Sequence, residues 1–132
     1  MKTIRSLILF AFFAAAPIAL FAGSISGMVQ LPKGEIIPPG SSVEVELRDV
    51  SRADAITMLV AKVSVRDGGG KNDAPFEIKF DDKKILPANS YSVSCRIIAK
   101  GKLLYINDAH IPVITHDAPF KDIALPVTKV KH

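Results

Sequence analysis

The sequence has one cysteine, Cys95, and no tryptophan among its 132 residues. A lone cysteine excludes an intrachain disulfide and any metal site built from several cysteines. Basic residues form no dense stripe along the chain, so nucleic acid is not expected as a partner. Helical periodicity is missing after residue 23, which excludes a parallel α/β fold with helical crossovers.

The first 22 residues have the pattern of a secretory signal peptide. Lys2 and Arg5 precede an uncharged, almost wholly apolar stretch. A transmembrane helix needs about 20 apolar residues, whereas this run is shorter and contains Pro17. We therefore expect residues 1–22 to be cleaved and residues 23–132 to form one exported domain, with no membrane span after cleavage.

Short runs of alternating apolar and polar residues make up the rest of the chain. In the clearest run, Ser42 to Val50, the valines and Leu47 share one face and the charged residues share the other. Prolines at 112 and 126 indicate edge strands. The further expected strands are 25–31, 58–66, 75–80, 91–100, 102–107, 109–115 and 123–130. This pattern predicts an all-β fold: a single β-sandwich, Ig-like or related, of about seven short, mainly antiparallel strands.

The same alternation assigns side chains to the core. Val45, Leu47, Phe76 and Ile78 are expected in one apolar layer between the sheets. Cys95 alternates in phase with its apolar neighbours, which predicts a buried, unreactive thiol. In the run from Met58 to Arg66, we expect the apolar side chains of residues 59, 61, 63 and 65 to share one face.

Residues with catalytic or metal-binding chemistry do not form a recognisable motif. The nearest candidates are the neighbouring pairs Asp108 with His110 and His116 with Asp117, and none has a metal-ligand spacing. The sequence therefore favours a non-catalytic binding module without cofactor or metal. The alternative, a small envelope ligand-binding protein or enzyme, requires a concave pocket with converging polar groups.

Three blocks resemble the YscW/YbaY family of small Gram-negative envelope proteins. They are "IPPGSSVEVELRDVSRADA", "APFEIKFD" and "YSVSCRIIAKGKLLYINDAHIPVIT". The resemblance implies an exported β-sandwich, and its YscW-type members are type III secretion pilotins that bind the C-terminal tail of a secretin subunit. Such proteins usually carry a lipid-accepting cysteine at the mature N-terminus, where this chain has "ALFAGS". We therefore expect a periplasmic protein without a lipid anchor.

A partner, another envelope protein or a secretin segment, needs an exposed apolar groove or an open strand edge. The segment "RDVSRADA", residues 48–55, follows a clear strand, and Asp49, Ser51 and Asp54 are suited to capping turns. We expect this segment to be mainly structural, with Arg52 as its candidate contact. The candidate partner-binding residues are Ile111, Val113, Thr115 and Arg52.

Overall fold

The computed structural model describes residues 23–52 and 56–131, which form nine strands and one 3-10 turn. Their bounds are β1 (Gly23–Gln30), β2 (Ser41–Asp49), β3 (Met58–Asp67), β4 (Asp73–Phe80), η1 (Asp82–Lys84), β5 (Tyr91–Ala99), β6 (Lys102–Ile106), β7 (Ile111–Val113), β8 (Ile123–Pro126) and β9 (Thr128–Lys129). None of the described residues belongs to a helix long and apolar enough to cross a membrane. The predicted signal peptide lies outside the described residues.

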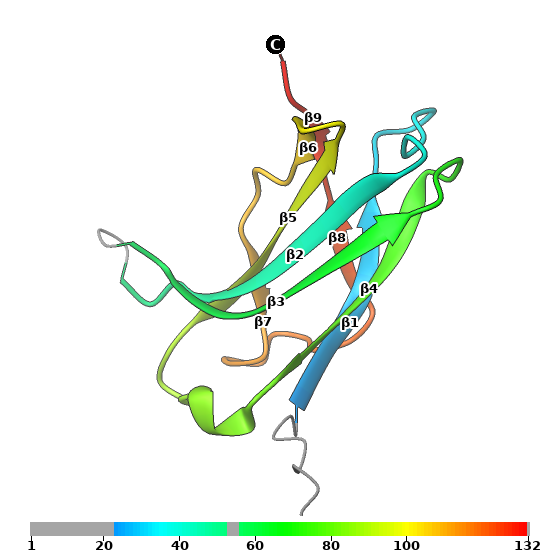
Figure 1. The fold of residues 1–132 in the computed structure, drawn as a ribbon. Coiled ribbons are helices and arrows are strands. Elements are labelled where there is room, and N and C mark those ends of the chain that lie inside the picture. The colour runs from blue at the N-terminus through cyan, green and yellow to red at the C-terminus, as the bar shows by residue number, and fades with distance from the viewer. Residues whose placement is uncertain (1–22, 53–55, 132) are drawn as a thin grey trace, which may run out of the picture.

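The strands form two sheets packed face to face (Figure 1). The smaller sheet has the order β4-β1-β8, and the larger has the order β3-β2-β5-β6-β9, with β7 pairing β5. Every pair is antiparallel except β1 with β8. The predicted β-sandwich is confirmed. The predicted strand 123–130 divides in two because the chain crosses at Val127 from the smaller sheet to the larger.

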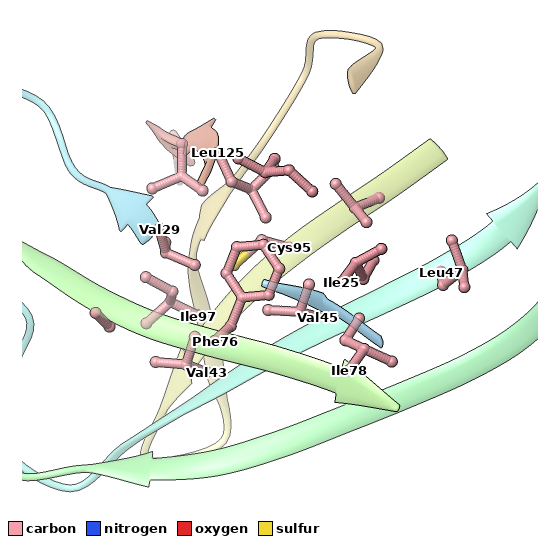
Figure 2. Packing of buried hydrophobic residues seen from close by; sticks show 14 of the residues in the cluster. Ile25, Val29, Val43, Val45, Leu47, Phe76, Ile78, Cys95, Ile97 and Leu125 are labelled. Carbon is pink, nitrogen blue, oxygen red and sulfur yellow. The ribbon is translucent and has the colours of Figure 1, made fainter. Parts of the chain in front are cut away.

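The core lies between the two inner faces (Figure 2). Side chains of β2, β4 and β5 meet there, and the predicted layer of Val45, Leu47, Phe76 and Ile78 is confirmed because all four are buried. Cys95 is 1% exposed among them, as predicted. Burial raises the pKa of its thiol to about 12, so the reactive thiolate is disfavoured at neutral pH.

Strand β3 differs from the prediction at its start. The pairing register with β2 shifts there, so that Leu47 pairs with Ala61 and Arg48 pairs with Leu59. Val60 is the extra residue of this bulge and packs against the core. The expectation that Leu59 shares a face with Ala61 and Val63 is wrong, because one inserted residue reverses the phase of all side chains before it. Leu59 is 50% exposed.

The two ends of the sandwich are built differently. At one end, the loop before β2 packs on the turn between β3 and β4, where Leu31 N–H donates to Asn72 O and Ile37 N–H donates to Lys71 O. At the other end lie the β2–β3 hairpin, the β4–β5 connection with η1, and the β7–β8 connection (Figure 1). We call the end with these three connections the hairpin end.

Candidate functional site

The hairpin end is organised by the carboxylate of Asp49. Its Oδ1 accepts from Ser51 N at 2.9 Å and from Ser51 Oγ at 2.5 Å, and its Oδ2 accepts from Asn89 Nδ2 at 2.9 Å. The hydrogen bond from the Ser51 hydroxyl is the largest cause of the lowered pKa of Asp49; burial, the second, opposes it, and the hydrogen bonds from Ser51 N–H and Asn89 add to the lowering. These contacts support the structural role expected for Asp49 and Ser51, whereas Asp54 lies outside the described residues.

Asn89 joins this network to the β7–β8 connection. While its amide donates to Asp49, its backbone oxygen accepts from Thr115 Oγ1 at 2.7 Å. Ser51 contributes a further link, because its hydroxyl accepts from Ser90 N at 3.0 Å. The structure thus brings together the Arg52 loop and Thr115, two candidate segments that are 63 positions apart in the chain.

The β7–β8 connection begins with a tight, strained turn at Ile114. Thr115 N–H donates to Val113 O at 2.9 Å across Ile114, whose φ is 73°. This is the geometry of a γ-turn of the rare, strained kind, and a positive φ is a true outlier for a β-branched residue. This conformation costs of order 1–3 kcal/mol, and the Ile114 side chain lines a groove.

That groove has a volume of about 450 Å³ and lies where the smaller sheet meets the two connections of the hairpin end. Its lining is mixed, because four apolar side chains stand together with two serines, one cation and one carboxylate. The lining residues are Gly23, Ser24, Ser26, Phe80, Asp82, Ile85, Ile114, Phe120 and Lys121. Phe120 is 55% exposed, an unusual position for a large aromatic side chain, and its backbone oxygen accepts from Ser26 N–H at 3.2 Å.

A second hollow of about 340 Å³ lies at the same end, beneath the β2–β3 hairpin. Asp49, Ser51 and Asn89 form its polar side, and Ile56 and Met58 form its apolar side. Arg52 also lines this hollow and is exposed. Arg48, at the start of this segment, pairs with Glu46, because its Nε donates to Glu46 Oε1 at 2.9 Å.

The four predicted partner residues lie in different environments. Val113 is fully buried and Ile111 is partly buried against the core, so their side chains belong to the sandwich interior. Thr115 is half-buried and hydrogen-bonded, whereas Arg52 is exposed. Sequence reasoning missed Phe120. The feature that could have identified it is a single phenylalanine in a polar connection, outside every predicted strand.

The residues considered for catalysis do not converge on either hollow. His110, His116, Asp108 and Asp117 are exposed, and the central pair His116 and Asp117 occupies a turn with φ of 57° and 66°. In the part of the chain that the structure describes, no three side chains of His, Cys, Asp or Glu are grouped to hold a metal ion.

Comparison with known families shows which protein family the chain belongs to. Residues 21–125 match the family model described as type III secretion system lipoprotein chaperone (YscW). The chain belongs to the YscW family. This match includes every residue that lines the larger groove.

Two relatives extend the YscW assignment. The chain is 29% identical over 102 residues to the uncharacterized lipoprotein YbaY of Escherichia coli (strain K12); this covers 77% of the chain and 54% of the relative, so the chain spans about half of that protein. It is also similar to an alternative pilotin from the type II secretion system of Vibrio cholerae. That structure matches with a TM-score of 0.78 and 34% identity, over 83% of this chain and 98% of the other.

Proposed function

We propose that this YscW-family protein is a pilotin-like assembly chaperone of the Gram-negative envelope, which holds an apolar segment of an outer-membrane secretion component at its hairpin end. The observation that carries the proposal is a groove lined by four apolar side chains, among them the exposed Phe120, on a domain of a lipoprotein-chaperone family. The similar pilotin of a second secretion system supports it.

The chemistry of the groove favours peptide side chains as its occupant. Phe80, Ile85, Ile114 and Phe120 offer apolar surface, and removing such surface from water contributes about 25 cal/mol per Å². An amphipathic segment places its apolar residues on one face and suits an open groove of this kind. Lys121 and Asp82 give the lining one charge of each sign, so a partner with a charged group of either sign near its anchoring residues has an opposite charge to meet.

Of the residues predicted to bind a partner, Thr115 and Arg52 lie at the hairpin end and are retained in the proposal. Thr115 fixes the β7–β8 connection through Asn89, and Arg52 lies at the rim of the second hollow. Ile111 and Val113 position that connection from within the core. A partner that contacts β7 itself would do so through the backbone edge of the strand, since these two side chains face the core.

The proposed site of action is the periplasm. The relatives are described as lipoproteins, and the cysteine of this sequence, Cys95, is buried inside β5. We propose that Cys95 carries no lipid, because a folded β-sandwich leaves its thiol no access to an acyl donor. Labelling of cells with radioactive palmitate should leave the protein unlabelled, and a labelled product would contradict this part of the proposal.

Binding is tested with fluorescent peptides that tile the C-terminal regions of the secretin subunits encoded in the same genome. We expect at least one peptide to bind the wild type and the Ile36→Glu variant, and to lose binding to the Phe120→Glu variant. Ile36 is a matched control because it is 56% exposed, against 55% for Phe120, and lies in the loop at the opposite end. Equal binding by both variants, or no binding by any peptide, would contradict the proposal.

The cellular experiment measures secretin assembly. Cells without the protein should retain the secretin as monomers or misplace its multimers, and the Ile36→Glu variant should restore outer-membrane multimers while Phe120→Glu should not. If deletion leaves the amount and location of every secretin multimer unchanged, the assembly role is refuted even where a peptide binds.

A further inference from the structure

The edges of the two sheets are protected unequally. Proteins usually block exposed strand edges with short strands, prolines or charges, because an open edge pairs with other chains. Here β7, β8 and β9 have three, four and two residues, and proline interrupts β4 at Pro75, β7 at Pro112 and β8 at Pro126. Strand β3 is different, because it has ten residues and no proline, and its edge is protected only by the bulge at its start and by the charges of Lys62 and Arg66.

The outer side of β3 carries backbone groups that no strand among the described residues pairs, since β3 is the terminal strand of the larger sheet. After the bulge, the inward-facing residues of β3 are apolar but incompletely covered. Ala61 and Val63 are partly buried, and Val65 is 47% exposed. The opposite, outward face carries Lys62 and Arg66. A strand added here would place its inward side chains beside Val63 and Val65 and its outward side chains beside two cations.

The neighbour of β3 on its other side shows which sequence complements it. Strand β2 reads Val43, Glu44, Val45, Glu46, Leu47, and each valine pairs with an apolar residue of β3. On the outward face, Glu46 is opposite Lys62 and the Glu44 carboxylate lies 3.7 Å from Lys62 Nζ. Opposite charges across a strand pair are stabilising.

We propose that the outer edge of β3 is a second binding surface, and that its ligand is an extended segment of another protein in which apolar residues alternate with acidic ones. The segment adds as a further strand, with its apolar residues beside Val63 and Val65 on the inward face and its carboxylates beside Lys62 and Arg66 on the outward face. This surface is the long edge of the larger sheet and is lined by none of the residues of the larger groove, so the inference stands apart from the proposed function.

Charge argues against a second copy of this chain as the ligand. Antiparallel pairing of two β3 strands would bring a second row of Lys62 and Arg66 beside the first, and like charges across a pair are destabilising. The acidic, alternating pattern that β3 needs is found within this chain in β2, which is already paired on both sides by β3 and β5. A foreign segment of the same pattern is therefore the occupant.

The probe is an acetylated and amidated peptide, SSVEVELRD, with the sequence of residues 41–49. Its binding to the whole domain is followed by shifts of backbone amide resonances in a ¹H–¹⁵N NMR titration. We expect saturable shifts in β3, and we expect a peptide with both glutamates replaced by lysine to bind about five- to tenfold more weakly, because it loses two opposite-charge pairs. Shifts along β5 instead would indicate replacement of β2 by the peptide and would overturn the proposal.

Three variants complete the experiment. Val65→Lys puts a charge on the inward side of the open edge and should weaken binding of SSVEVELRD at least about tenfold. Arg66→Glu should lower the affinity for the acidic peptide and raise the affinity for the lysine peptide, about threefold each. Phe120→Glu should change neither affinity. Equal affinity of Val65→Lys and wild type would overturn the proposal. So would concentration-dependent dimers of the wild type that Val65→Lys abolishes, because a second copy would then occupy the edge.

Discussion

The substitution Asp49→Ala tests whether the hairpin end depends on one carboxylate. It removes the acceptor of three hydrogen bonds, two from Ser51 and one from Asn89. From the sequence alone, Asp49 is expected to make a single local turn bond, whose removal lowers the free energy of unfolding by about 0.5–1.5 kcal/mol. The structure adds the bond to Asn89, 40 positions away, which ties the β2–β3 hairpin to the β4–β5 connection.

The expected loss is therefore larger than that of a simple turn residue. Hydrogen bonds to charged groups contribute about 1.5–3 kcal/mol each when buried, but Asp49 is only partly buried and water replaces part of each bond. We expect about 2 kcal/mol for the three bonds together. For a domain of this size, this lowers the melting temperature by roughly 8 °C.

Thermal and urea unfolding of Asp49→Ala, Asn89→Ala and the double variant measure the loss and its coupling. The sum of the stability losses of the two single variants should exceed the loss of the double variant by about 0.5 kcal/mol or more, as for residues in one network. Arg52→Ala is the control, because Arg52 is exposed on the same segment, and it should change the free energy of unfolding by less than about 0.5 kcal/mol.

The pH dependence gives an independent measurement. The pKa of Asp49 is lowered from 3.8 in the folded protein, so its stabilisation is present above about pH 4 and is lost as the pH falls through the folded pKa. Asp49→Asn should lose less stability than the wild type between pH 4 and 2. The reasoning is refuted if Asp49→Ala and Arg52→Ala unfold at the same temperature, or if the losses of Asp49→Ala and Asn89→Ala simply add.

Three further outcomes follow from the core. Leu47→Ala should reduce the free energy of unfolding by about 2–5 kcal/mol in urea titrations, since Leu47 is 0% exposed; a loss below 1 kcal/mol would contradict the packing. Gly27→Ala should unfold at a much lower temperature than Met28→Ala, because a Cβ at Gly27 would lie 2.0 Å from Ile123 O; equal melting temperatures would contradict this close approach. Cys95, whose pKa is raised to about 12, should react with a thiol reagent quickly in urea and slowly in the native protein; rapid native labelling would show that the site opens.

Much of the fold could be predicted because β-strands leave a local signal. The alternation of Val43 to Leu47 places side chains on two faces by backbone geometry alone, and the structure has that strand within one residue of its predicted bounds. Pro112 and Pro126 marked edge strands because proline lacks the N–H that a central strand must donate. Leu59 could not be placed correctly, since its orientation depends on a bulge that only the pairing with β2 defines.

The candidate site depended much more on the tertiary structure. Asp49 and Ser51 were recognisable as turn-capping residues from their types, whereas their partner Asn89 and its bond to Thr115 join segments that are distant in the sequence. The groove at Phe120 exists because the β7–β8 connection lies against the start of β1, where Ser26 N–H donates to Phe120 O. No local pattern specifies such a contact.

By itself the sequence determined the class of fold, the inward faces of most strands and the family resemblance, because these depend on side-chain order along one strand at a time. The tertiary structure alone decided which edges are open, where the groove lies and which loops share an end. Those properties depend on which strands pair and in what register, and pairing is set by packing energy summed over the whole core.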